Sequence, residues 1–157
     1  MKTTRESVRE SNHRRVVKCL QELLQKNYEA EKDYRKAMEH ADEEVLKDFC
    51  KKGRVRHNHF ATEIDSFLHD LNEHPLDPDD QLDLLKAWTN FKTSIGKHRD
   101  DALLDECLNG EKKAAKDYKE KLKKNRFPAQ IEESLEKQLK EIEVLLADVK
   151  SIEDLRW

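Results

Sequence analysis

Polar side chains interrupt the apolar pattern of this sequence at positions where they could meet inside a helical protein. Glu31 and Glu111 each lie midway between apolar residues that stand seven positions before and after them, and Gln138 has the same spacing. A step of seven residues returns to nearly the same face of an α-helix. We therefore expect Glu31, Glu111 and Gln138 on the inner sides of three helices.

A further helix carries two histidines and an acidic residue close to its apolar stripe. His57 lies one turn before Phe60, while His59 and Glu63 are four residues apart near the edge of the stripe. Residues four apart lie above one another on a helix, so His59 and Glu63 can act on the same ligand.

A buried carboxylate must be neutralised, paired or bound to a metal, because burial of an isolated charge is costly. Several carboxylates that meet in a helical bundle favour a cation such as iron or manganese. The candidate ligands for such a cation are Glu31, Glu63 and Glu111, assisted by His57 or His59. The sequence thus offers iron or manganese as a cofactor, in a degenerate carboxylate site.

The spacing expected of a dinuclear metal site is incomplete, however. Such bundles supply one Glu from each of two helices and a Glu-x-x-His pair from each of the other two. The only Glu-x-x-His pair here joins Glu10 to His13, far from the other candidates, and arginines stand three residues before His57 and His59.

A structural use of the same acids is therefore the favoured interpretation. Glu31 could pair with Arg54 or Arg56 or bond Tyr118, and Glu111 could bond Gln138 or a tyrosine. Buried polar groups of this kind can fix the register between helices. We expect a non-catalytic structural, stress-related or interaction protein, with a homo-oligomer or a protein partner, and metal binding as the alternative.

Apolar periodicity and capping residues predict the elements that position these side chains. The first helix should start near Ser7 or Ser11, where Ser7 and Glu10 can form a capping box, and end at His40. Asp42 should cap the second helix, which ends before Pro75. The remaining predicted helices are a short one from Pro78 to about Ile95, one from about Asp100 to Lys124, and one from Pro128 to beyond Ile152.

These elements predict an all-α fold in which four long helices form two hairpins. The stretch from Pro75 to Arg99 is long enough to serve as a helical crossover between them, as an antiparallel four-helix bundle of this connectivity requires. We expect one bundle domain over residues 16–155. Residues 1–15 should be a polar, basic extension or the start of the first helix.

Composition agrees with long helices that bury one stripe each. Hydrophobic residues make up 36% and charged residues 41% of the 157 residues, and only three glycines and three prolines occur. The net charge of −3 gives no general attraction for nucleic acid, although the first fifteen residues are locally basic. The sequence has neither a long apolar run nor a secretory leader, and three cysteines without a CxxC pair fit reduced thiols, so we expect a cytoplasmic protein without a membrane span.

Four short segments resemble a bacterial four-helix-bundle family with a domain of unknown function, placed in the ferritin-like superfamily. They are Asn27–Tyr34, His59–Ile64, Asn109–Lys112 and Val149–Leu155, and the resemblance extends over about Val16–Leu155. It implies a ferritin-like, cytoplasmic, bacterial bundle with no established reaction. It also implies that Glu31, Glu63 and Glu111 match the helical acids of the family. Some relatives carry a histidine near the position of Leu146, which is absent here, so ferroxidase activity does not follow from the fold.

Overall fold

The computed structural model describes residues 3–75 and 99–156, which form five α-helices and no β-strand. The helices are α1 (Thr4–His40), α2 (Glu44–Asp70), α3 (Arg99–Lys124), α4 (Ala129–Asp148) and α5 (Ile152–Leu155). The expected all-α class is confirmed. The short helix expected up to about Ile95 lies outside the described residues.

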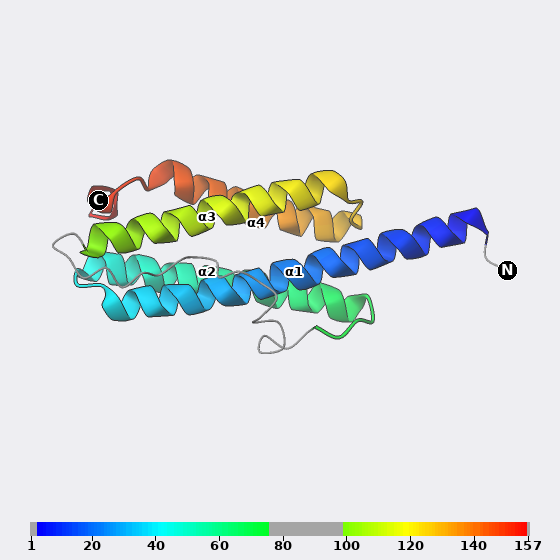
Figure 1. The fold of residues 1–157 in the computed structure, drawn as a ribbon, viewed down its shortest axis with the longest axis horizontal. Helices are drawn as coiled ribbons and strands as arrows, with labels where there is room; N and C mark the ends of the chain where they lie inside the picture. The colour runs from blue at the N-terminus through cyan, green and yellow to red at the C-terminus, as the bar shows by residue number, and fades with distance from the viewer. Residues whose placement is uncertain (1–2, 76–98, 157) are drawn as a thin grey trace.

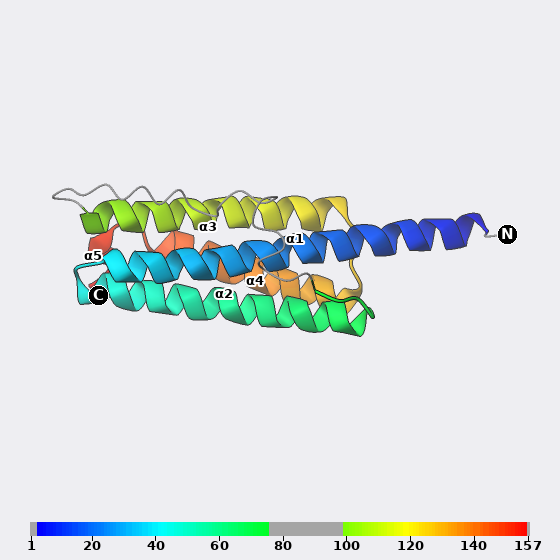
Figure 2. The same ribbon diagram turned by 60° about the horizontal axis from the view of Figure 1, so that its bottom comes forward.

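The four long helices lie side by side along one axis (Figures 1 and 2). Helix α1 runs antiparallel to α2, and α3 runs antiparallel to α4. Because α2 and α3 both start at the end where α1 finishes, these two helices point in the same direction. At the opposite end, the first turns of α1 extend beyond the other helices, and residues 3–9 are exposed.

Helix α1 starts earlier than its sequence pattern indicates. The backbone N–H of Glu6 donates to Thr3 Oγ1, and a carboxylate oxygen of Glu6 accepts from the Thr3 N–H, each at 3.1 Å. This capping box replaces the one expected at Ser7 and Glu10, because nothing between the two positions interrupts the helix. The expected end at His40 is confirmed.

Helix α2 takes its cap from another helix. Its N-cap residue is Glu43, and the Asp100 carboxylate at the start of α3 accepts the N–H groups of Asp42 and Glu43 at 2.9 and 2.8 Å. The prediction that the Asp42 side chain caps α2 is therefore wrong. The carboxylate from α3 instead holds the backbone donors just before α2 and also ties the two hairpins together.

The last predicted helix is interrupted before its end. Helix α4 stops at Asp148, because Val149 adopts an extended backbone, and the short α5 follows. The carboxylate of Asp154 accepts the N–H groups of Lys150 and Ser151 at 2.7 and 3.1 Å, which fixes this corner. Ile152 is still buried, as expected, but it reaches the core from α5.

The core consists of two apolar clusters that are separated along the helix axis. One contains Leu24, Phe60 and Ile64, and the other contains Phe49 and Leu104, each among further buried residues. Buried polar side chains from all four long helices lie between them. We call Asn27, His57, Glu111 and Gln138 the polar layer. In the described part of the chain, every helix is too short or too polar to span a membrane.

Candidate functional site

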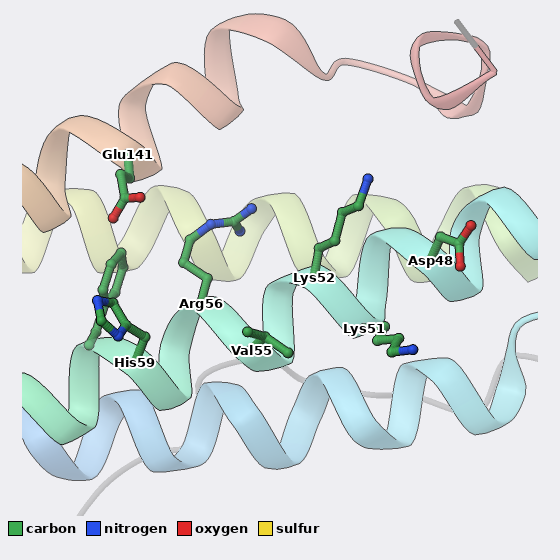
Figure 3. Close-up of a pocket in the computed structure, with 8 residues that line it drawn as sticks. Asp48, Lys51, Lys52, Val55, Arg56, His59 and Glu141 are labelled. Carbon is green, nitrogen blue, oxygen red and sulfur yellow. The ribbon is translucent and has the colours of Figure 1, made fainter.

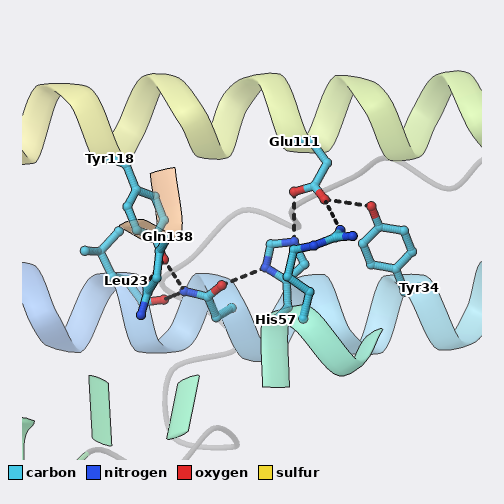
Figure 4. Close-up of polar contacts among 8 residues, drawn as sticks. Leu23, Tyr34, His57, Glu111, Tyr118 and Gln138 are labelled. Carbon is cyan, nitrogen blue, oxygen red and sulfur yellow. Dashed lines mark hydrogen bonds and ion pairs between the residues drawn. The ribbon is translucent and has the colours of Figure 1, made fainter. Parts of the chain in front are cut away.

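Glu111 of α3 is the centre of the polar layer and has no exposed surface. Its Oε1 lies 2.8 Å from Nε2 of His57, and its Oε2 accepts the hydroxyl of Tyr34 at 2.8 Å (Figure 4). The guanidinium of Arg56 forms an ion pair with the same carboxylate, with 3.6 Å between NH1 and Oε2. Side chains of α1 and α2 thus neutralise and bond a carboxylate of α3.

The amide of Asn27 determines that Nδ1 of the His57 ring is protonated. Its Nδ2 donates to the backbone oxygen of Leu23 at 2.8 Å, and because that oxygen can only accept, the orientation of the amide is fixed. The Asn27 Oδ1 therefore faces Nδ1 of His57, at 2.7 Å. Nδ1 must carry a proton to make this hydrogen bond.

The hydrogen bond between His57 and Glu111 then requires one shared proton. With Nδ1 already protonated, the pair is either imidazolium with carboxylate or imidazole with carboxylic acid. The positive charge of Arg56 beside Oε2 favours the ionic form. His57 therefore acts as a donor at both ring nitrogens in this arrangement.

The environment of Glu111 lowers its pKa in spite of complete burial. Desolvation, the largest single effect, raises the pKa of this carboxyl. The charge and hydrogen bond of His57, the hydroxyl of Tyr34 and the charge of Arg56 together outweigh it, so that the pKa is lower than usual. Glu111 is thus held as a carboxylate at neutral pH.

A chain of hydrogen bonds continues from the polar layer to the surface. Nδ2 of Asn27 donates to the hydroxyl of Tyr118 at 3.0 Å, and this hydroxyl donates to Gln138 Oε1 at 2.7 Å (Figure 4). Nε2 of Gln138 donates to a carboxylate oxygen of Glu63 at 3.4 Å, and Ser134 bonds the other oxygen at 2.9 Å. The layer therefore links α1, α2, α3 and α4 in one network.

Gly53 makes room for the aromatic ring that reaches Glu111. The ring of Tyr34 lies across this glycine of α2, and a Cβ there would come within 2.5 Å of Cζ of the ring. Phe49 packs edge-on against the same ring, with the ring centroids 6.0 Å apart, and His57 stacks on it at 5.8 Å. A side chain at position 53 would displace the hydroxyl that bonds Glu111.

The five candidate ligands do not meet at one point, and only two of them lie in the polar layer. Glu111 and His57 meet in the polar layer, and Glu63 touches that network through Gln138. We expected Glu31 on the inner side, but it lies at the rim of the bundle. Its side chain is 19% exposed and contacts Asn58 and Arg35.

The remaining candidate, His59, is at the surface. Its side chain is 68% exposed and lies 3.4 Å from a carboxylate oxygen of Glu63, which is itself 36% exposed. The two side chains thus meet at the rim of the bundle and not in its interior. In residues 3–75 and 99–156, no three His, Cys, Asp or Glu side chains gather closely enough to surround a metal ion.

The donor set at the centre is also a poor match for iron or manganese. A carboxylate-bridged site needs several acidic ligands, whereas the polar layer contains the single carboxylate of Glu111. Arg56 already places a positive charge beside that carboxylate. A cation at this position would have to displace both Arg56 and the proton shared with His57.

Sequence reasoning identified Glu111, His57 and Gln138 but only some of their partners. The expectation that Glu111 bonds a tyrosine is confirmed, and the tyrosine is Tyr34. Arg56, one of two arginines that could have paired with Glu31, pairs with Glu111 instead. The signals that could have found this arrangement are Asn27 on the apolar stripe of the first helix and a glycine opposite Tyr34.

The fold and the site together define an all-α protein with a buried, hydrogen-bonded ion-pair layer between two apolar clusters. A family profile, the domain of unknown function DUF2383, matches residues 15–124, and the chain belongs to this family. The matched segment includes Asn27, Tyr34, His57 and Glu111 and ends before Gln138. Searches found no matching curated protein and no matching solved structure.

Proposed function

We propose that this DUF2383 protein is a non-catalytic, ferritin-like four-helix bundle that works by association with another protein chain. The observation that supports this most strongly is the closure of the polar layer. Both carboxylate oxygens of Glu111 and both ring nitrogens of His57 contact protein groups, and the two side chains are 0% and 1% exposed. Groups held in this way serve the fold rather than a substrate.

The directions of the helices support the ferritin-like part of the proposal. The second and third long helices, α2 and α3, run in the same direction, so the two hairpins need one long connection. Residues 76–98 are long enough to provide it. A ferritin-like bundle has this connectivity. A bacterial cytoplasm, implied by the resemblance of the sequence, is the matching location.

The projecting start of α1 is the surface that we assign to association, with a second copy of the chain as the partner. Residues 3–9 are exposed, and Val8 is the most exposed large apolar side chain of the described residues. An isolated helical segment of this length is marginal in water, so contact with another chain would stabilise it. Its alternating charges, such as Arg5, Glu6 and Arg9, allow two antiparallel copies to place opposite charges together.

Sedimentation velocity of the full, untagged chain tests the association. We expect an oligomer at micromolar concentration that dissociates in Val8→Glu, since a carboxylate in the contact would be desolvated. Val144→Glu, at an exposed position of α4, is the matched control and should leave the oligomer intact. A monomer at every concentration would remove this part of the proposal.

Metal binding is the alternative, and the contact between Glu111 and His57 is the observation that favours it, because both are common ligands. Elemental mass spectrometry of untagged protein, after anaerobic incubation with ferrous iron or manganese, separates the two proposals. We expect no stoichiometric metal. Retention near one or two ions per chain that is lost in Glu111→Ala would overturn the structural role and establish a ferritin-like metal site.

A further inference from the structure

A pocket of about 550 Å³ opens on the face that α2 turns toward α4. One wall is formed by successive turns of α2 from Asp48 to His59, and Glu141 of α4 lies opposite (Figure 3). This volume is in the range of small-molecule binding sites. The pocket is separate from the closed interior of the polar layer, although both use Arg56.

The walls combine an apolar surface with positive charge. Val55, next to the fully buried Phe60, contributes exposed apolar surface, and Lys51, Lys52 and Arg56 contribute cationic groups. Figure 3 shows the side chains of Lys52 and Arg56 extending from α2 toward α4. Such a surface suits a molecule with an apolar body and an anionic head.

The charges around the pocket favour a single negative charge on the ligand. Lys51, Lys52 and Arg56 supply three positive charges, and Asp48 and Glu141 supply two negative ones, which leaves one positive charge in excess. A carboxylate matches this excess, whereas a phosphate dianion adds repulsion from the two acids.

The cations around the pocket are also incompletely paired. NH1 of Arg56 is buried and makes no hydrogen bond, although it contributes to the ion pair with Glu111. Within residues 3–75 and 99–156, Lys51 and Lys52 form no ion pair, in contrast to Lys26 and Lys121. The two unpaired lysines leave positive charge on this wall that an anionic group of a ligand can neutralise.

We propose that this pocket binds a small amphiphilic carboxylate, with the head between Lys52 and Arg56 and the apolar body against Val55. This inference goes beyond the proposed function, because it concerns a different surface and does not depend on association or on metal. It assigns Arg56 two roles, as the counterion of Glu111 on one side and as a wall of the pocket on the other.

Calorimetric titration of the full chain with octanoate tests the proposal. Octanol, which has the apolar chain without the charge, and inorganic phosphate, which has negative charge without the chain, are titrated for comparison. We expect octanoate to bind with one site per chain and both partial probes to bind at least about tenfold more weakly. Amide shifts in an NMR titration should centre on residues 51–60. Equal affinity for octanol would overturn the role of the cations, and equal affinity for phosphate would overturn the role of the apolar wall.

Two variants at exposed positions separate the contributions. Lys52→Gln should weaken octanoate binding about tenfold, and Val55→Asp should abolish it, because a new carboxylate would face the ligand. Lys113→Gln, at an exposed lysine of α3 outside the pocket, is the control and should bind octanoate normally. No octanoate binding by the wild-type chain, or equal weakening in Lys52→Gln and Lys113→Gln, would contradict the proposal.

Discussion

Glu111 shows how one buried charge can be made compatible with a helical core. A guanidinium, an imidazole and a phenol surround its carboxylate, and each comes from a neighbouring helix. Removing one partner of such a pair is strongly destabilising because the other charge remains buried. Any packing that leaves Glu111 without these partners is therefore strongly destabilised. In this way Glu111 helps to specify how the helices pack.

The acid stability of the protein should depend on Glu111. A carboxyl whose pKa is lower in the folded than in the unfolded protein stabilises the fold above its unfolded pKa, about 4.3. This stabilisation is lost as the pH falls through the folded pKa. We expect the difference in unfolding free energy between wild type and Glu111→Gln to shrink as the pH is lowered from 7 to below 4. Urea unfolding followed by circular dichroism measures it, and Glu133→Gln, at an exposed site, is the control. A difference independent of pH would contradict the ionised state of Glu111.

Replacing Gly53 tests its contact with Tyr34, because helix propensity and packing predict opposite changes in the free energy of unfolding. At an exposed helix position, Gly→Ala stabilises a helix by about 1 kcal/mol. Here the added Cβ would press on the ring of Tyr34, so we expect Gly53→Ala to lower the unfolding free energy by about 2 kcal/mol. The loss should be smaller in a Tyr34→Leu background, whose shorter side chain leaves space. Thermal or urea unfolding decides, and a stabilised Gly53→Ala protein would show that the ring moves freely.

For single residues, the sequence predicts which side chains are buried better than it predicts which side chains they contact. A spacing of seven placed Glu111 and Gln138 correctly, whereas Glu31 lies at the rim and Asn27 of the same helix lies inside. A straight helix drifts by about 20° per seven residues, so spacing alone becomes unreliable near the edge of a stripe. Which helix supplies Arg56 or Tyr34 to Glu111 depends on tertiary packing, which local spacing does not contain.

Among the elements, the long helices are predictable and their ends are less so. The end of α1 at His40 and nearly the whole of α3 follow from periodicity and flanking residues. The cap of α2 does not, because Asp100 is distant in the sequence. The break between α4 and α5 was missed because Ile152 continues the apolar spacing across it.

Asp100 should contribute more to stability than Asp42, although Asp42 has the better local position for a cap. We expect Asp100→Ala to lower the unfolding free energy by about 1–2 kcal/mol, because two backbone donors just before α2 lose their acceptor. Asp42→Ala, the matched control, should change it by less than about 0.5 kcal/mol. Urea unfolding measures both changes. A larger loss for Asp42→Ala than for Asp100→Ala would indicate that Asp42 caps α2 and would contradict a stabilising contact between the hairpins.

For the whole molecule, the polar layer divides the core and thereby fixes how the helices are aligned. The two apolar clusters are similar in character, so helices could slide by one or two turns and still bury apolar residues. A slipped helix would bury Glu111 or His57 without a partner, which is unfavourable. The network thus specifies one alignment of α1, α2 and α3.

A double-mutant cycle on Glu111 and His57 tests this role most directly. The free energy of unfolding is measured in urea at pH 7 for wild type, Glu111→Gln, His57→Gln and the double variant. We expect each single change to cost about 3–5 kcal/mol, because it leaves a buried group without its partner. The double variant should cost less than their sum by at least about 1 kcal/mol. Costs that add to within about 0.5 kcal/mol would mean that the two side chains act independently, and would contradict a buried ion pair that holds the bundle in register.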